Sequence, residues 1–208
     1  MEAGSPTHSK PLTVGGFVAR TLAWLPLAFA VWYFTAPVLL APAVMIVRAF
    51  ARVGFGDIVR SVEQSANAVT FVTALRPGNA AMAGVVTVDV NLLLYSFGLP
   101  MLAALILAAR ERAWKRHLAI GYVALQPFIA WGVLADFLKN VAITAGPVVA
   151  SQTGFVAWQR EAIAFAFQFG SLILPAVVPA VLWVAMHGRF LAALRRSRGS
   201  EAGAPQGS

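Results

Sequence analysis

Four charged residues at the ends of two apolar stretches are the strongest candidates for chemistry in this sequence. Asp136 and Lys139 close one stretch, and Arg160 and Glu161 open the next. Asp136 and Lys139 are three residues apart, so a helix would place them on one face, where they can pair. Arg160 is a second potential partner for Asp136. We expect structural pairing at this rim, with reception of a partner or a substrate as the alternative.

Other patterns for catalysis or metal binding are missing from the sequence. The chain has no cysteine, which excludes disulfides, thiolate nucleophiles and cysteine-ligated metals. It contains no glycine-rich phosphate loop, no His-Glu-x-x-His and no Gly-x-Ser-x-Gly. Its three histidines are His8, His117 and His187, and only Glu111 lies near them in sequence as a further ligand. We therefore predict no catalytic residue, no cofactor and no metal site, and interpret these histidines as interfacial cations.

The elements that must position the charged rim are membrane helices. Four uncharged apolar stretches, 18 to 27 residues long, cover 21–47, 90–109, 118–135 and 162–186. A helix that crosses the hydrocarbon core of a bilayer needs about 20 residues. The composition agrees, with 59% hydrophobic and 12% charged residues and a mean hydropathy of +0.74. The predicted fold class is an all-α integral membrane protein with four transmembrane helices.

The positive charge of the chain follows this topology. The net charge is +8, and placing both termini in the cytoplasm puts +7 on the inner segments against +1 on the outer ones. Lysine and arginine are enriched in short cytoplasmic loops. We therefore attribute the charge to topology and to contact with membrane lipids, and predict no nucleic-acid partner.

Residues 48–89 differ from the apolar stretches and predict a small extracytoplasmic β-meander between the first two helices. Polar residues alternate there with β-branched ones over 58–64, 68–75 and 84–90. Val86, Val88 and Val90 share one face. Three short strands bury little by themselves, so we expect the meander to dock on the helices or on a partner.

The chain is thus divided into nine segments. Prolines in the first apolar stretch predict a tilt or a broken outer end. Gly146-Pro147 and the polar residues after it favour an interfacial or re-entrant segment over a fifth span. The segments are a cytoplasmic tail at 1–20, membrane helices at 21–47, 90–109, 118–138 and 162–187, the outer insert at 48–89, a cytoplasmic loop at 110–117, an outer loop or interfacial helix at 139–161, and a basic cytoplasmic tail at 188–208.

Two parts of the chain resemble the exosortase H-associated membrane protein family. One is 90–100, with Asn91, Tyr95, Gly98 and Pro100, and the other is 158–163, with Trp158, Gln159, Arg160 and Glu161, followed by 170–175. The likeness extends over most of the chain, from about Arg20 to Leu194. In that family proline commonly follows Asn91, whereas here Leu92 stands there. The quoted residues, with Asp136 and Lys139, form our candidate partner-binding or structural site.

The resemblance implies a bacterial inner-membrane accessory to an exosortase, the membrane protease that processes C-terminal sorting signals of exported proteins. Such a protein would be a non-catalytic subunit whose partners are membrane lipids and an exosortase-like protease or its substrate. Two other functions stay open from the residues alone. One is a membrane enzyme acting on a lipid or glycan at the outer rim, with Asp136 or Glu161 as acid or base, and the other is a small transporter subunit.

Overall fold

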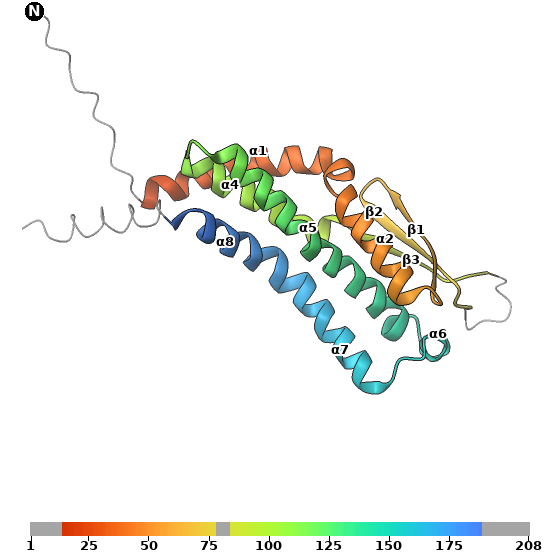
Figure 1. Cartoon of the computed structure of the whole chain (residues 1–208). Coiled ribbons are helices and arrows are strands. Elements are labelled where there is room, and N and C mark those ends of the chain that lie inside the picture. The colour runs from red at the N-terminus through yellow and green to blue at the C-terminus, as the bar shows by residue number, and fades with distance from the viewer. Residues whose placement is uncertain (1–13, 78–83, 189–208) are drawn as a thin grey trace, which may run out of the picture.

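The computed structural model describes residues 14–77 and 84–188, and within them the chain forms a helical bundle with a small sheet at one end (Figure 1). The predicted tails lie outside the described residues apart from 14–20 and residue 188. Residues 14–20 belong to a helix rather than to a tail. The long side chain of Arg20 stays on this helix, since its Nε donates to the carbonyl of Gly16 at 2.9 Å.

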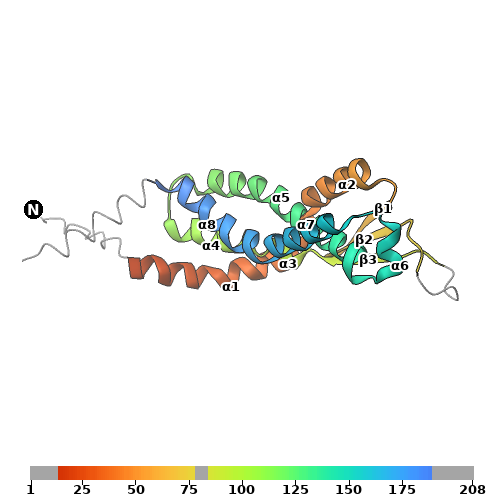
Figure 2. The same ribbon diagram turned by 90° about the horizontal axis from the view of Figure 1, so that it is seen from below.

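Four passes of chain build the bundle, and they run in alternating directions (Figures 1 and 2). The start of the first pass and the end of the last therefore lie at the same end of the molecule, and the sheet lies at the other. The passes are α1 (Val14–Leu39), α3 with α4 (Leu93–Ser96 and Gly98–Ala109), α5 (Trp114–Lys139), and α7 with α8 (Ala157–Gln168 and Leu174–Met186).

Three helical segments are long and apolar enough to span a membrane. They are Val14–Leu39, Trp114–Thr144 and Ala157–Met186. The predicted span at 90–109 differs, because Val90 and Asn91 end a strand and the apolar helical segment covers only Leu93–Ala109. At 1.5 Å per residue this segment reaches about 25 Å, less than the roughly 30 Å of a hydrocarbon core.

The first apolar stretch is two helices, not the single helix predicted at 21–47. Helix α1 ends at Leu39 and α2 (Ala41–Phe55) begins with Pro42 in its first turn. Proline has no amide proton to continue the hydrogen-bond pattern of α1, so the helix breaks at this point. The expected broken outer end is confirmed. Helix α2 buries one face, formed by Ala43, Val44, Val47 and Ala51, and it packs on α5 and on the sheet.

The sheet is a three-stranded antiparallel meander in the order β1-β2-β3, as predicted. The strands are β1 (Val59–Ser65), β2 (Ala68–Thr73) and β3 (Thr87–Asn91). Val69 and Phe71 face the same buried side as Val88 and Val90. Phe71 stacks on Phe137 of α5 with ring centroids 4.2 Å apart. The expected docking of the sheet on the helices is therefore confirmed.

The segment predicted at 139–161 continues α5 and then turns along the sheet. The last turns of the helix widen into a π-helix, η1 (Asn140–Thr144), and a short helix α6 (Pro147–Gln152) follows Gly146, whose φ is 88°. The Gln152 side chain accepts from the backbone N–H of Arg76 and donates to its carbonyl, both at 2.9 Å. A second π-helix, η2 (Phe169–Ile173), joins α7 to α8.

Candidate functional site

A buried carboxylate at the sheet end of α5 holds the largest group of predicted site residues together. Asp136 is 9% exposed, and its carboxylate accepts a hydrogen bond from the Tyr95 hydroxyl. Lys139 Nζ lies 3.0 Å from Asp136 Oδ1, and Asn140 Nδ2 donates to the same oxygen at 3.0 Å. The predicted Asp136–Lys139 pair is thus present. The neighbours of this carboxylate are donors, as a buried charge requires.

Lys139 also links α5 to α7. Its Nζ lies 4.1 Å from the centroid of the Phe167 ring, a distance typical of a cation–π contact. The ammonium group is therefore held between a carboxylate and an aromatic face. Arg160 was the alternative partner for Asp136, and no ion pair joins these two residues, both of which the structure describes.

Glycines allow the close packing that brings Tyr95 to Asp136. A Cβ atom at Gly132, one turn before Asp136, would collide with the ring of Tyr95. A Cβ atom at Gly170 would lie 3.1 Å from the Cα of Gly132 and 3.1 Å from the Trp131 ring. The passes of α3, α5 and η2 therefore meet at a point where only small residues fit, as is usual for membrane helices.

The other predicted residues of the first family-like segment serve the packing of the bundle. Asn91 ends β3, and its Oδ1 accepts from the N–H of Leu93 at 3.0 Å, at the start of α3. A Cβ atom at Gly98 would lie 2.7 Å from the Pro175 carbonyl oxygen. Pro100 is buried. These residues are placed apart from the Asp136 cluster.

The second family-like segment forms the first turn of α7, at the sheet end of the bundle. The Oε1 atom of Gln159 accepts from the N–H of Val156 at 3.0 Å and caps the helix. Trp158 is 68% exposed. Arg160 and Glu161 line an open hollow of about 480 Å³ beside Gly146 and Pro147. We refer to Trp158–Glu161 as the α7 rim.

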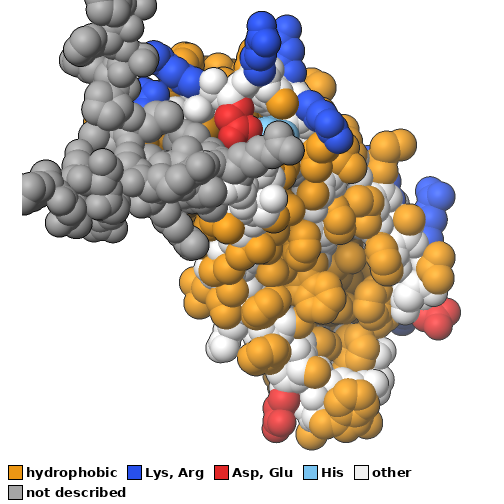
Figure 3. Space-filling view, turned by 60° about the vertical axis from the view of Figure 1, so that its left-hand side comes forward, with side chains coloured by type: hydrophobic (Ala, Val, Ile, Leu, Met, Phe, Trp, Pro, Cys, Tyr) orange, Lys and Arg blue, Asp and Glu red, His pale blue; other side chains and the backbone are white. Residues whose placement is uncertain are grey.

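A groove that sequence reasoning missed runs beside this rim, between α2 and α7 over α5. Its volume is about 690 Å³, and its lining is almost wholly apolar, with Phe50 of α2, Trp131 and Leu138 of α5, and Ile163 and Phe165 of α7. Figure 3 shows how hydrophobic side chains cover one long face of the molecule with few polar interruptions. The break at Leu40 creates the groove, since α2 leaves the direction of α1 there. The prolines of the first apolar stretch were its only signal.

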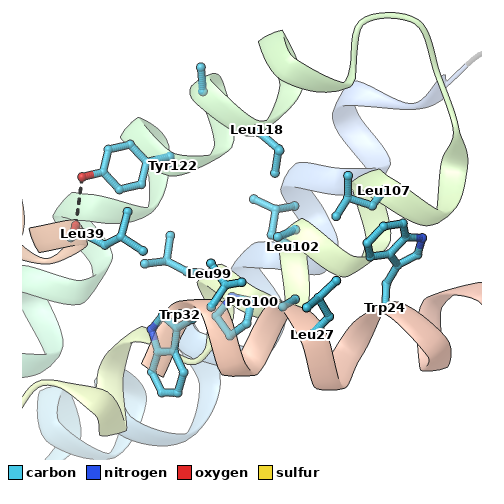
Figure 4. A pocket seen from close by; sticks show the side chains of 14 residues that line it. Trp24, Leu27, Trp32, Leu39, Leu99, Pro100, Leu102, Leu107, Leu118 and Tyr122 are labelled. Carbon is cyan, nitrogen blue, oxygen red and sulfur yellow. Dashed lines mark hydrogen bonds between the residues drawn. The ribbon is translucent and has the colours of Figure 1, made fainter. Parts of the chain in front are cut away.

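A second apolar hollow, of about 470 Å³, lies between α1, α4 and α5 (Figure 4). Trp24 and Trp32 of α1 flank it. At its edge the Tyr122 hydroxyl donates to the carbonyl of Leu39 at 2.9 Å. This bond satisfies a carbonyl that the end of α1 leaves without a helical partner. The hollow is distant from the α7 rim in sequence and in element, and none of the predicted site residues except Pro100 lines it.

The residues that could hold a metal ion gather at the opposite end of α5. Glu111, His117 and His187 offer ligand atoms that all lie within 4.8 Å of one another. His187 is buried, unlike the interfacial cation expected from the sequence. The Asp136 cluster itself is a carboxylate already supplied with donors, which is an arrangement that holds helices together.

A family model described as "Exosortase H-associated membrane protein" matches residues 11–190 of the chain. No curated protein and no solved structure matches.

Proposed function

The chain belongs to the exosortase H-associated membrane protein family, and we propose that it is a non-catalytic membrane subunit that binds exosortase H through the groove between α2 and α7. The family description gives the partner, and the groove gives it a place to bind. In this proposal one transmembrane helix of the exosortase lies in the groove, and the α7 rim contacts the same partner at the membrane surface.

The groove carries the proposal because of its lining and its position. Its walls come from two of the helical segments that can span a membrane, Trp114–Thr144 and Ala157–Met186, and from α2. Helices in a bilayer associate by close packing of apolar and small side chains. Phe50 is 61% exposed and Phe165 is 68% exposed at its edges, so both side chains are free to contact a partner.

The pairing of Asp136 supports a structural role for the rim over an enzymatic one. A general base must reach the substrate with an oxygen that is free to take a proton. Tyr95, Lys139 and Asn140 already surround the Asp136 carboxylate. The absence of cysteine also means that this chain does not supply a cysteine nucleophile itself.

We further propose that the protein lies in the bacterial inner membrane with both termini in the cytoplasm and the sheet outside. The alternating directions of the four passes support this orientation, because they put the beginning of α1 and the end of α8 at one end (Figure 1). The loop at that end carries Arg110, Arg112, Lys115 and Arg116, which favour the cytoplasmic side.

Co-purification with a filled groove tests the proposed function. Ala162 is exposed and lines the groove, so Ala162→Trp should fill it at small cost to folding. Ala30 is equally exposed, lies on α1 and lines neither apolar hollow, which makes Ala30→Trp the matched control. We expect exosortase H to co-purify in detergent with the wild type and with Ala30→Trp, and to be reduced at least fivefold with Ala162→Trp. Equal recovery with both variants would count against the groove.

A further inference from the structure

We propose that Glu111, His117 and His187 bind a divalent transition-metal ion, with Zn²⁺ as the best match, at the end of the bundle opposite the sheet. This site is separate from the groove and from the Asp136 cluster. It would join the α4–α5 loop to the end of α8, two parts of the chain that are 70 residues apart or more.

The three ligands come from three different elements. Glu111 follows Arg110, whose left-handed conformation with φ 53° ends α4 and turns the loop. His117 lies in the first turn of α5, and His187 follows the last residue of α8. Figure 3 shows a histidine and an acidic side chain close together at the end of the molecule where lysine and arginine side chains gather. The fold, and no sequence motif, assembles this set.

The spacing suits a tetrahedral metal ion. Glu111 Oε2 lies 3.6 Å from His117 Nδ1 and 3.9 Å from His187 Nε2. Ligand atoms about 2.0–2.1 Å from a tetrahedral Zn²⁺ are about 3.3 Å apart. The present distances are too long for hydrogen bonds, and movements of a few tenths of an ångström would close them around an ion.

His187 is already oriented as a metal ligand. Its ring Nδ1 lies 2.9 Å from the Trp183 carbonyl, which can only accept, so Nδ1 carries the proton and Nε2 presents its lone pair. A histidine that binds a metal usually donates its other nitrogen in this way. The ring stacks on Trp183 with centroids 5.1 Å apart, and this contact fixes its plane.

The environment of the two rings favours the neutral form that a metal needs. His187 is 1% exposed, and its Nε2 has no hydrogen-bond partner among the described residues; the same is true of His117 Nδ1. Burial lowers the pKa of His187, which adds to this preference. Two imidazole lone pairs and a carboxylate around one point repel one another, and a cation removes that cost.

Three protein ligands leave a fourth position for water or another donor. An open hollow of about 600 Å³ lies beside the set and is lined by Glu111, Arg112, His117 and Met186 among others. The nearby cations Arg112, Lys115 and Arg116 are exposed, so water screens their repulsion of a bound ion. Two histidines with one glutamate, and an open position, form a known Zn²⁺ ligand set.

Zn²⁺ titration of the purified full chain, carrying a histidine-free affinity tag, tests this site. We expect one Zn²⁺ per chain by competition with a chromophoric chelator. Glu111→Gln, His117→Ala and His187→Ala should each weaken binding at least tenfold, since the loss of even an outer partner of a ligand costs that much. His8→Ala is the matched control, because His8 is the third histidine of the chain and lies outside the described residues. It should bind like the wild type.

A second measurement separates lost binding from lost folding. Zn²⁺ should raise the thermal unfolding midpoint of the wild type and of His8→Ala, and leave that of Glu111→Gln unchanged. Glu111 is partly exposed, so this variant keeps its fold and decides the test if His187→Ala does not fold. The proposal is overturned if the wild type binds no Zn²⁺, if His8→Ala loses binding as strongly, or if the triple variant binds like the wild type.

Discussion

The Tyr95 hydroxyl donates a hydrogen bond to the Asp136 carboxylate and so joins the end of the sheet to the middle pass of the bundle. Tyr95 comes from the short helix that follows β3, and Asp136 from the last turn of α5. Both side chains are buried. The contact therefore fixes how the sheet sits on the helices that form the groove.

Removing this hydrogen bond should destabilise the protein without unfolding it. Tyr95→Phe leaves the buried carboxylate with one donor fewer, which costs about 1–3 kcal/mol. Thermal unfolding in detergent should show a lower midpoint for Tyr95→Phe. Asp136→Asn should lower it too, and the double variant should lose less than the two single losses added together, because both changes remove the same bond. Full additivity would show that the two side chains do not interact.

The glycine contact beside this pair should tolerate no added side chain. Gly132→Ala places a methyl group against the Tyr95 ring, and overpacking of this kind costs about 1–3 kcal/mol. Gly54 of α2 has open space around it, so Gly54→Ala is the matched control and should be neutral or slightly stabilising. Unfolding midpoints of the two variants would check this. A Gly132→Ala protein as stable as the control would contradict the close packing.

The stacked pair of Phe71 and Phe137 should hold the sheet on the bundle. Both rings are fully buried, so Phe71→Ala should cost about 3–5 kcal/mol. Val53 is 90% exposed, and Val53→Ala should change little. Hydrogen exchange of the β2 and β3 amides measures the effect directly. Faster exchange in Phe71→Ala, with unchanged exchange in the middle of α5, is the expected result; unchanged exchange in the strands would show that other contacts hold the sheet.

The proposed topology can be tested with single cysteines, because the natural chain has none. Ser65 ends β1 and Ala113 lies in the α4–α5 loop, and both residues are exposed. A thiol reagent that does not cross membranes should label Ser65→Cys in cells whose outer membrane alone is opened. It should label Ala113→Cys only after the inner membrane is opened too. The reverse pattern would invert the orientation and place the Glu111 cluster outside.

The sequence predicted what local patterns determine. Apolar length predicted membrane helices, alternation of Val86, Val88 and Val90 predicted the meander, and a spacing of three predicted the pair of Asp136 and Lys139. Each of these depends on neighbours along the chain. The break near Pro42 followed from the missing amide proton.

Contacts between distant segments could not be predicted in this way. Tyr95 is 41 residues from Asp136, and no local period relates them. The convergence of Glu111 with His187 requires knowing that the fourth pass returns to the α4–α5 loop. The end of the second apolar stretch was misjudged for a related reason, since Val90 and Asn91 pair with β2, and this pairing overrides their apolar continuity with Leu92.

The position of exosortase H on this protein is tested most directly by photo-crosslinking from single cysteines at the groove. Phe50→Cys and Phe165→Cys would carry a photoactivatable maleimide at the groove edges, and Val184→Cys, exposed on α8 away from the groove, is the control. In membranes that contain both proteins, we predict an adduct with exosortase H from the two groove positions and none from Val184. Adducts with lipid alone at Phe50 and Phe165, or equal exosortase adducts from all three positions, would contradict the groove as its binding site.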